Sequence, residues 1–190
     1  MSIVLASGSP RRRELMEMLR VKDLVIIPAK GEEEKLPGRG PEQTVKALSR
    51  AKAAEIAAQR PDTDVVIGAD TIVWLDGCIL GKPKDAEDAR AMLRALSGRT
   101  HEVYSGVTVM LGGRTLCESE CTAVRFKPLG EAEIAAYVAT GEPMDKAGAY
   151  AAQGLASLFV EGIEGDFFNV MGLPLFRLGR MLDELGVKLI

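Results

Sequence analysis

Short apolar runs and helical patterns alternate at both ends of this 190-residue chain. Segments typical of buried strands lie at 3–6, 24–27 and 64–75. Helical patterns begin at Ser9-Pro10, cover 41–60, and follow Asp85, with Gly98 just past the end of the third. Alternation of this kind is characteristic of a sheet with helices packed on its faces. The chain therefore predicts an α/β fold, and its length suits one domain with a real core or two small lobes that share one.

The middle of the chain is rich in strand patterns. Alternating segments at 101–111 and 114–126 flank Gly112-Gly113 and predict a long hairpin, and Asp76-Gly77 predicts another hairpin turn. We expect the remaining elements to be a helix at about 130–140, a polar loop at 141–154, a strand with a turn at 155–165 and a helix at 173–185. Together these elements predict a single 1–190 domain with a mixed, curved sheet flanked by helices, in which two lobes enclose a cleft.

Composition excludes several classes of protein. The net charge of -3 does not indicate a general nucleic-acid binder, since such binding depends on many positive charges. The first apolar run is too short for a signal peptide, and no apolar stretch approaches the roughly 20 residues that span a bilayer. Three cysteines without a C-x-x-C pair do not indicate a disulfide framework. We expect a cytoplasmic protein without nucleic-acid or membrane partners.

The helix that begins at Ser9-Pro10 carries three arginines in its first turn. Arg11, Arg12 and Arg13 lie at the positive end of the helix dipole, where acidic residues are preferred. Backbone amides at the helix start, the serines of "SGS" and the guanidinium groups together resemble a phosphate-binding site. Three solvated arginines on a surface helix are the alternative interpretation.

Asp70 lies inside "VVIGADTIVW", a strand pattern otherwise free of charge. Alternation places Gly68 and Asp70 on one face of the strand and Thr71 on the other. A buried carboxylate requires an ion-pair partner, water or a metal ion, because burying it alone costs several kcal/mol. Gly68 leaves space beside it. A salt-bridged aspartate in a partly exposed strand is the alternative.

Two lysines and an acidic run complete the inventory. Lys52 lies in a helical pattern among small residues, and Lys82 stands between Gly81 and Pro83. In the alternative interpretation each lysine is an ordinary surface residue. The acidic run 32–34 is likewise an ordinary solvated loop in that interpretation. One of its glutamates could join Asp70 in holding a divalent cation, since Mg²⁺ takes one or two carboxylates plus phosphate oxygens. The residues alone indicate a metal-dependent enzyme that acts on a phosphorylated small molecule, with water as nucleophile.

Four segments, in order along the chain, carry a family resemblance. They are "LASGSPRRRELM", "GADTIVWLDGCILGKPKDAEDARAMLRALSGRTHEVYSGV", "DKAGAYAAQG" and "GDFFNVMGLPL". Together they resemble the Maf family of nucleoside triphosphate pyrophosphatases. The resemblance implies hydrolysis between the α and β phosphates with a divalent metal, Mg²⁺ or Mn²⁺. It also implies an α/β fold with a deep cleft between two lobes, and a homodimer.

The form "KAGAY…QG" resembles the branch of the family that acts on dTTP and UTP, with modified pyrimidine nucleotides as an open extension. The resemblance also implies roles for single residues. Asp70, in "GADT", matches the family's proposed general base. Positions linked to substrate choice are matched by Arg12, Thr71 and Gln153. The remaining polar cleft residues are matched by Ser9, Arg13, Glu33, Lys52 and Lys82. We expect Glu33 and Asp70 to be the ligands of this metal ion.

Two departures from the family pattern bear on these assignments. The chain has Glu32-Glu33 where the family usually has Asp-Glu, so the cleft carboxylate is Glu33 or, alternatively, Glu34. Ala151 replaces a glycine of the common "AYGIQG". The alternative function is a nucleotide-binding regulator of cell division or septum formation without significant turnover. Carboxylates facing a polyanion gain little without a metal, so Asp70 and Glu33 favour an enzyme.

Overall fold

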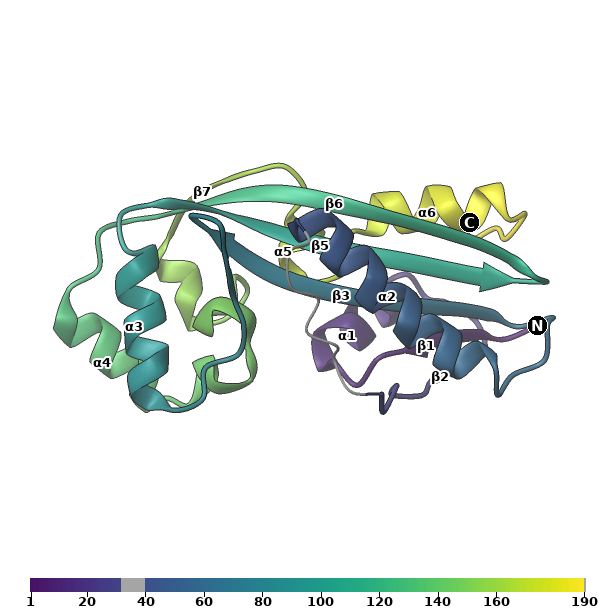
Figure 1. Cartoon of the computed structure of the whole chain (residues 1–190), viewed down its shortest axis with the longest axis horizontal. Coiled ribbons are helices and arrows are strands. Elements are labelled where there is room, and N and C mark those ends of the chain that lie inside the picture. The colour runs from purple at the N-terminus through teal and green to yellow at the C-terminus, as the bar shows by residue number, and fades with distance from the viewer. Residues whose placement is uncertain (32–39, 190) are drawn as a thin grey trace. The chain divides into compact units, whose positions relative to one another are not determined.

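The computed structural model describes residues 1–31 and 40–189 (Figure 1). In this part of the chain the strands are β1 (Ile3–Ala6), β2 (Leu24–Ile26), β3 (Val65–Leu75), β4 (Cys78–Leu80), β5 (Thr100–Leu111), β6 (Arg114–Phe126) and β7 (Val160–Glu164). They form a seven-stranded sheet in the order β2-β1-β3-β5-β6-β7, with β4 paired to β3. The sheet is mixed, because β1 is parallel to β2 and β3, whereas β4 is antiparallel to β3 and β7 is antiparallel to β6.

Helices accompany the strands along the chain. The α-helices of the described residues are α1 (Pro10–Met18), α2 (Pro41–Ala57), α3 (Ala86–Leu96), α4 (Glu131–Ala139), α5 (Phe167–Met171) and α6 (Leu175–Glu184). The same described residues also form the short 3₁₀ helices η1 (Glu142–Asp145), η2 (Ala147–Ala149) and η3 (Leu155–Leu158). A mixed sheet flanked by helices confirms the predicted fold class. No helix of the described residues is both long and apolar enough to cross a membrane.

The chain divides into two compact units. Unit 1 comprises Met1–Asp70, Ser105–Glu120 and Gly172–Ile190, and unit 2 comprises Thr71–Tyr104 and Cys121–Met171. The long strands β3, β5 and β6 each contribute one part to each unit. Two lobes that enclose a cleft remain a prediction.

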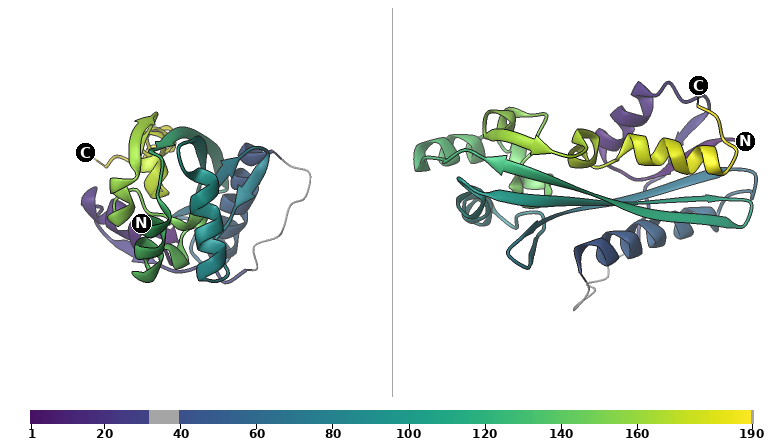
Figure 2. Two further views of the ribbon diagram at one scale, coloured as in Figure 1. Left: turned by 90° about the vertical axis from the view of Figure 1, so that its left-hand side faces the viewer. Right: turned by 90° about the horizontal axis from the view of Figure 1, so that it is seen from above.

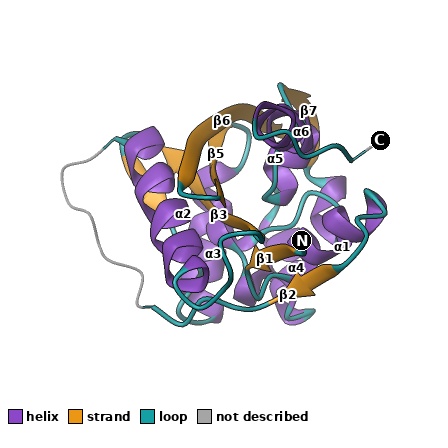
Figure 3. Cartoon of the chain, turned by 90° about the vertical axis from the view of Figure 1, so that its right-hand side faces the viewer, coloured by secondary structure: helices purple, strands orange, loops and turns teal. Residues whose placement is uncertain are grey.

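Unit 1 is built on the parallel strands β1, β2 and the first half of β3. Figure 3 shows α2 on one side of β1 and α1 on the other. The α2 face is closed by small and branched apolar side chains. They are Val4, Ala6, Ala53, Ile56 and Val66. Helix α6 lies across the sheet from α2 (Figure 2), and its Arg177 forms ion pairs with Glu118 and Glu120 of β6 at 2.6 and 2.7 Å.

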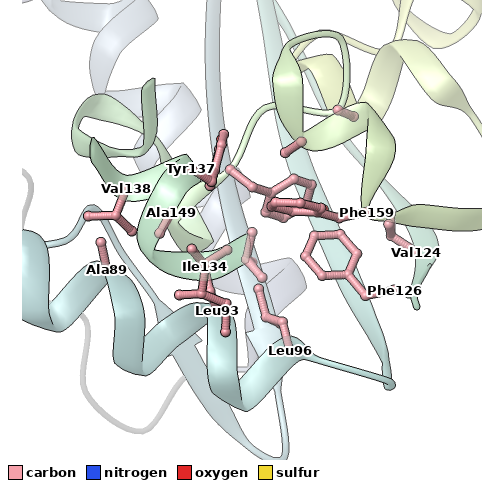
Figure 4. Close-up of a cluster of buried hydrophobic side chains, with 14 of the residues drawn as sticks. Ala89, Leu93, Leu96, Val124, Phe126, Ile134, Tyr137, Val138, Ala149 and Phe159 are labelled. Atoms are coloured by element: carbon pink, nitrogen blue, oxygen red, sulfur yellow. The ribbon is translucent and has the colours of Figure 1, made fainter. Parts of the chain in front are cut away.

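Unit 2 has its own hydrophobic core between α3, α4 and the strand segments (Figure 4). Aromatic rings dominate one side of it, with Phe126 in edge-to-face contact with Tyr150 at a centroid distance of 4.8 Å and Tyr137 against Phe159 at 5.0 Å. Leu93 and other aliphatic side chains of α3 fill the opposite side. This core supports the loop between α4 and β7.

Local start and stop signals are confirmed where backbone chemistry determines them. The Asp85 side chain accepts a hydrogen bond from the backbone N–H of Asp88 at 2.8 Å and so caps α3. Gly98, just past that helix, has a φ of 67°. Gly112 and Gly113 both have positive φ, at 56° and 77°, as the turn between β5 and β6 requires.

The predicted strand with a turn at 155–165 is wrong in part. Residues 155–158 form the 3₁₀ helix η3, and β7 begins only at Val160. The structure shows why: Ala156 and Phe159 are buried while Leu155 and Leu158 are exposed, which is a period of three and not of two. The short helix α5 was not predicted. In the polar loop 141–154, the 3₁₀ turns η1 and η2 were also not predicted.

Candidate functional site

Arg12 is held in place within unit 1 by two oxygen atoms. Its Nε donates a hydrogen bond to the carbonyl oxygen of Gly172 at 2.8 Å, and its Nη1 donates to Ser7 Oγ at 3.2 Å. Ser7 is buried and directly follows β1. The guanidinium group is therefore oriented before any ligand arrives, as a bidentate anion-binding arginine would need to be.

Ser9 and Arg13 are placed differently from Arg12. Ser9 is the N-cap residue of α1 and Pro10 is the first helical residue, as predicted, but the Ser9 side chain makes no capping hydrogen bond. Its backbone N–H instead donates to Ser7 Oγ at 3.2 Å. Arg13 is exposed and pairs with Glu17 one turn further along α1 at 2.7 Å. The hydrogen bond to Glu17 raises the pKa of Arg13 above its usual value.

Lys52 and Asp70 meet inside unit 1, although 17 residues separate them in sequence. Lys52 Nζ donates to Asp70 Oδ1 at 2.5 Å, and the side chains are 20% and 8% exposed. The buried carboxylate thus has the partner that its position in β3 requires. The structure brings together two residues that the sequence indicates only separately.

Two glycines permit this contact, because they let α2 lie directly against the strands. A Cβ at Gly68 of β3 would lie 2.3 Å from the carbonyl oxygen of Ser49 and 2.7 Å from the backbone nitrogen of Ala53. A Cβ at Gly106 of β5 would lie 2.2 Å from the carbonyl oxygen of Val45. The space that Gly68 leaves beside Asp70 is therefore occupied by the backbone of α2, the helix that carries Lys52.

The acidic run 32–34 lies outside the described residues, and with it the predicted Glu33 and the alternative Glu34. The chain just before it is attached to α2. Glu55 accepts hydrogen bonds from the backbone N–H groups of Lys30 at 2.7 Å and Gly31 at 2.9 Å. These two hydrogen bonds hold the pKa of the Glu55 carboxyl below its usual value.

The remaining predicted residues belong to unit 2. Thr71 follows Asp70 in β3 and is half-buried, whereas Lys82 and Gln153 are exposed. Gly81, next to Lys82, accepts a hydrogen bond on its carbonyl oxygen from the N–H of Gly148 at 3.0 Å. The segments that carry Lys82 and Gln153 are therefore joined inside this unit.

The residues described here fit a divalent cation only in part. They contain no group of three or more His, Cys, Asp or Glu side chains placed to hold a metal ion. Asp70 supplies one buried carboxylate, and Mg²⁺ in phosphate sites takes one or two carboxylates together with phosphate oxygens. The donor set of Asp70 and a polyphosphate is therefore of the appropriate kind.

Sequence reasoning missed several residues that support this site. Ser7 lies in the same "SGS" motif as Ser9, yet it is Ser7 that contacts Arg12. The Gly172 carbonyl oxygen carries no side-chain signal at all. Gly106 was not singled out, although a glycine inside a strand pattern is a general indicator of close backbone approach.

Comparisons with known proteins agree over nearly the whole chain. Residues 2–185 match the family model described as Maf-like protein. Relatives named dTTP/UTP pyrophosphatase include one from Pyrococcus furiosus, 46% identical over 98% of this chain and 96% of the relative. Another, from Clostridium perfringens, is 44% identical over the full length of both chains.

Solved structures extend the comparison to the fold. The Staphylococcus aureus Ham1 protein matches with a TM-score of 0.54 and 13% identity, covering 97% of this chain and all of that one. A HAM1 protein from Coxiella burnetii matches with a TM-score of 0.52 and 16% identity, covering 97% and 99% of the two chains. At these identities the similarity concerns the fold alone.

Proposed function

The chain belongs to the Maf family, and we propose that it is a nucleoside triphosphate pyrophosphatase that hydrolyses dTTP and UTP. In this reaction water attacks the α-phosphorus and the bond to the oxygen that bridges the α and β phosphates breaks. The products are the nucleoside monophosphate and pyrophosphate. Full-length similarity carries the proposal, because relatives named for this activity are 44–46% identical over at least 98% of this chain.

The proposed catalytic group is the pair of Lys52 and Asp70. Asp70 orients the attacking water and accepts its proton, and the hydrogen bond from Lys52 Nζ fixes the direction of the carboxylate. Lys52 and Lys82 also supply positive charge for the leaving pyrophosphate. Partial burial of the pair supports these roles, since charges act more strongly on a developing anion where contact with water is reduced.

Arg12, Arg13 and the backbone amides at the start of α1 receive the triphosphate in this proposal. The attachment of Arg12 to Ser7 and Gly172 supports this, because an oriented guanidinium loses little freedom when it binds phosphate. Ser9, the N-cap residue of the same helix, is proposed to contribute to triphosphate binding at the helix start.

Asp70 and Glu33 are the residues that would hold a divalent cation, Mg²⁺ or Mn²⁺. A cation at such a position lowers the pKa of water and neutralises phosphate charge. Activation of the water by the cation would therefore add to what the Asp70 carboxylate supplies.

Gln153 is proposed to recognise the base, with Thr71 and Arg12 as further contributors to substrate choice. A glutamine amide donates and accepts hydrogen bonds at once, which suits the O4 atom and N3–H group of uracil and thymine. The exposure of Gln153 supports a role in ligand contact. We also propose that the protein is cytoplasmic, acts on free nucleotides and forms a homodimer.

Pyrophosphate release from a panel of nucleoside triphosphates tests the proposal. The panel contains dTTP, UTP, CTP, the purine triphosphates and 7-methyl-GTP, each with Mg²⁺, with Mn²⁺ and with chelator. We expect metal-dependent release that is fastest with dTTP and UTP. Preference for another base would retain the chemistry and contradict the assigned substrates. No release from any nucleotide would contradict the enzyme and favour a nucleotide-binding regulator.

A further inference from the structure

We propose that Glu142 is a positioning residue for Gln153: its carboxylate holds the turn that presents Gln153 and thereby sets the discrimination among bases. This inference rests on the proposed function, since it assumes that Gln153 contacts the base. All residues involved belong to unit 2.

The Glu142 carboxylate connects two segments on either side of the Gln153 turn. Its Oε2 accepts a hydrogen bond from the backbone N–H of Leu155 at 3.1 Å, at the start of η3. Its Oε1 accepts from the hydroxyl of Tyr137, in α4, at 3.0 Å. Tyr137 is buried and packs edge-to-face on Phe159. The carboxylate therefore attaches the chain directly after Gln153 to the core of the unit.

Gly154 shows how closely the carboxylate fits against this turn. A Cβ at Gly154 would lie 2.3 Å from Glu142 Oε1 and 2.8 Å from Oε2. Gly154 has a φ of -100°, which other residues also adopt, so its lack of a side chain is needed for this contact and not for its backbone conformation. The N–H of Gly154 also donates to the carbonyl oxygen of Ala151 at 3.0 Å, which places Gln153 at the centre of a tight turn.

The chain before Gln153 is fixed independently of the Glu142 carboxylate. The Tyr150 hydroxyl lies 2.7 Å from His101 Nε2, inside the core, and the N–H of Gly148 donates to Gly81. Loss of the Glu142 carboxylate would therefore release only the side of the turn that follows Gln153. A displaced amide at Gln153 weakens its hydrogen bonds to the base and leaves the phosphate chemistry of Lys52 and Asp70 in place.

The backbone of Glu142 is itself restrained by its neighbours. Its N–H donates to Thr140 Oγ1 at 3.1 Å, and its carbonyl oxygen accepts from Lys146 Nζ at 2.8 Å. Because the backbone is held at both its donor and its acceptor, a substitution of the side chain tests the carboxylate and not the path of the chain.

A double-mutant cycle tests the contact from both sides. Glu142→Ala removes the carboxylate, and Gly154→Ala adds a methyl group that displaces it. We expect each to lower the ratio of kcat/KM for dTTP over CTP by about ten-fold, the size of one hydrogen bond to a charged group. We expect KM for dTTP to rise and kcat to change by less than about two-fold. In the double variant the methyl group occupies the space left by the carboxylate. The double variant should therefore lose no more discrimination between dTTP and CTP than either single variant.

Milder variants and a control guard against general loss of structure. Tyr137→Phe removes the hydrogen bond from the Tyr137 hydroxyl to Glu142 and keeps the ring. Glu142→Gln keeps one acceptor oxygen. Both variants should lose discrimination between dTTP and CTP to an intermediate degree. Glu161→Ala is the matched control, because it removes an exposed carboxylate that pairs with Arg125 in the same unit. It should retain wild-type discrimination.

Amide hydrogen exchange gives a measure that does not depend on activity. In Glu142→Ala we expect exchange of the Leu155 amide to increase about ten-fold or more, and that of the core strand β5 to stay unchanged. Unchanged exchange at Leu155 would overturn the proposal.

The kinetic outcomes separate this proposal from the proposed function. If Gln153→Ala loses discrimination while Glu142→Ala and Gly154→Ala retain it, Glu142 is not a positioning residue and the function stands. Additive losses in the double variant would also overturn the direct contact. If the wild-type protein releases pyrophosphate from no nucleotide, the function fails and the inference about base discrimination fails with it, whatever the exchange rates show.

Discussion

Gly68→Ala is the substitution that most directly tests how unit 1 forms its catalytic pair. The added Cβ would lie 2.3 Å from the Ser49 carbonyl oxygen, 2.7 Å from the Ala53 nitrogen and 2.9 Å from the Ala53 Cβ. Two of these atoms belong to the helix backbone and cannot rotate away. To reach ordinary contact, α2 must retreat from β3 by about 1 Å.

The cost follows from that displacement. Overpacking of this size typically destabilises a protein by about 1–3 kcal/mol. A 1 Å retreat would also lengthen the 2.5 Å contact between Lys52 and Asp70 beyond a good hydrogen bond. Misplacement of a catalytic group by about 1 Å costs up to about 100-fold in rate. We therefore expect kcat to fall by about 10- to 100-fold in Gly68→Ala, with most of the protein still folded at 25 °C.

Urea unfolding and pyrophosphate release from dTTP measure the two effects. Gly179→Ala is the control, since it is the same chemical change in α6 of the same unit, where a Cβ meets nothing within 4 Å. Alanine favours a helix interior by about 0.5–1 kcal/mol, so this variant should be as stable as the wild type or more so. Gly106→Ala should destabilise in the same way and slow the reaction less, because its contact is with Val45, two helical turns before Lys52. Wild-type stability and kcat in Gly68→Ala would refute the close-approach argument.

Three further predictions concern single side chains. Asp70→Asn should lower kcat by about 100-fold or more while nucleotide binding, measured by calorimetry, persists; near-normal turnover would remove Asp70 from catalysis. Burial lowers the pKa of His101 from 6.5 to about 4, so the folded state favours the neutral ring. The contribution of His101 to the free energy of unfolding is complete above pH 6.5 and falls by about 3 kcal/mol at most as pH falls toward 4. Urea unfolding of His101→Gln at a series of pH values should lack this part of the pH dependence. Asp85→Ala removes the cap of α3 and should cost about 1 kcal/mol, seen as a lower Tm.

Elements whose ends are determined by local backbone chemistry could be predicted from the sequence. Asp85 and Gly98 mark the limits of α3, and Gly112-Gly113 marks the turn of the long hairpin, because caps and positive φ depend on few residues. The segment 155–158 could not be predicted in this way. Its apolar residues fit a strand and a 3₁₀ turn equally well until Ala156 is seen packing into the core of unit 2.

The candidate site likewise contains residues that local sequence identifies and contacts that it does not. Asp70 could be identified as unusual because a charge inside an apolar strand pattern requires a partner. That its partner is Lys52 depends on the distance between α2 and β3, which no local pattern contains. The roles of Ser7 and Glu142 depend likewise on contacts between elements, with Arg12 and with the N–H of Leu155.

A buried carboxylate and two glycines in neighbouring strands are therefore parts of one arrangement. An ion pair inside a protein is stable only at hydrogen-bond distance, since the loss of hydration must be offset by a close partner. Lys52 reaches Asp70 at that distance because Gly68 and Gly106 let the α2 backbone touch β3 and β5. A larger residue at either glycine would leave Asp70 buried beside a more distant ammonium group. It follows that the effects of substitutions at Gly68 and Asp70 on kcat should not be additive. Once Asp70 is replaced by a neutral residue, the close approach of α2 no longer serves an ion pair. The cost of Gly68→Ala in kcat should then largely disappear in an Asp70→Asn background, while its cost in stability should remain.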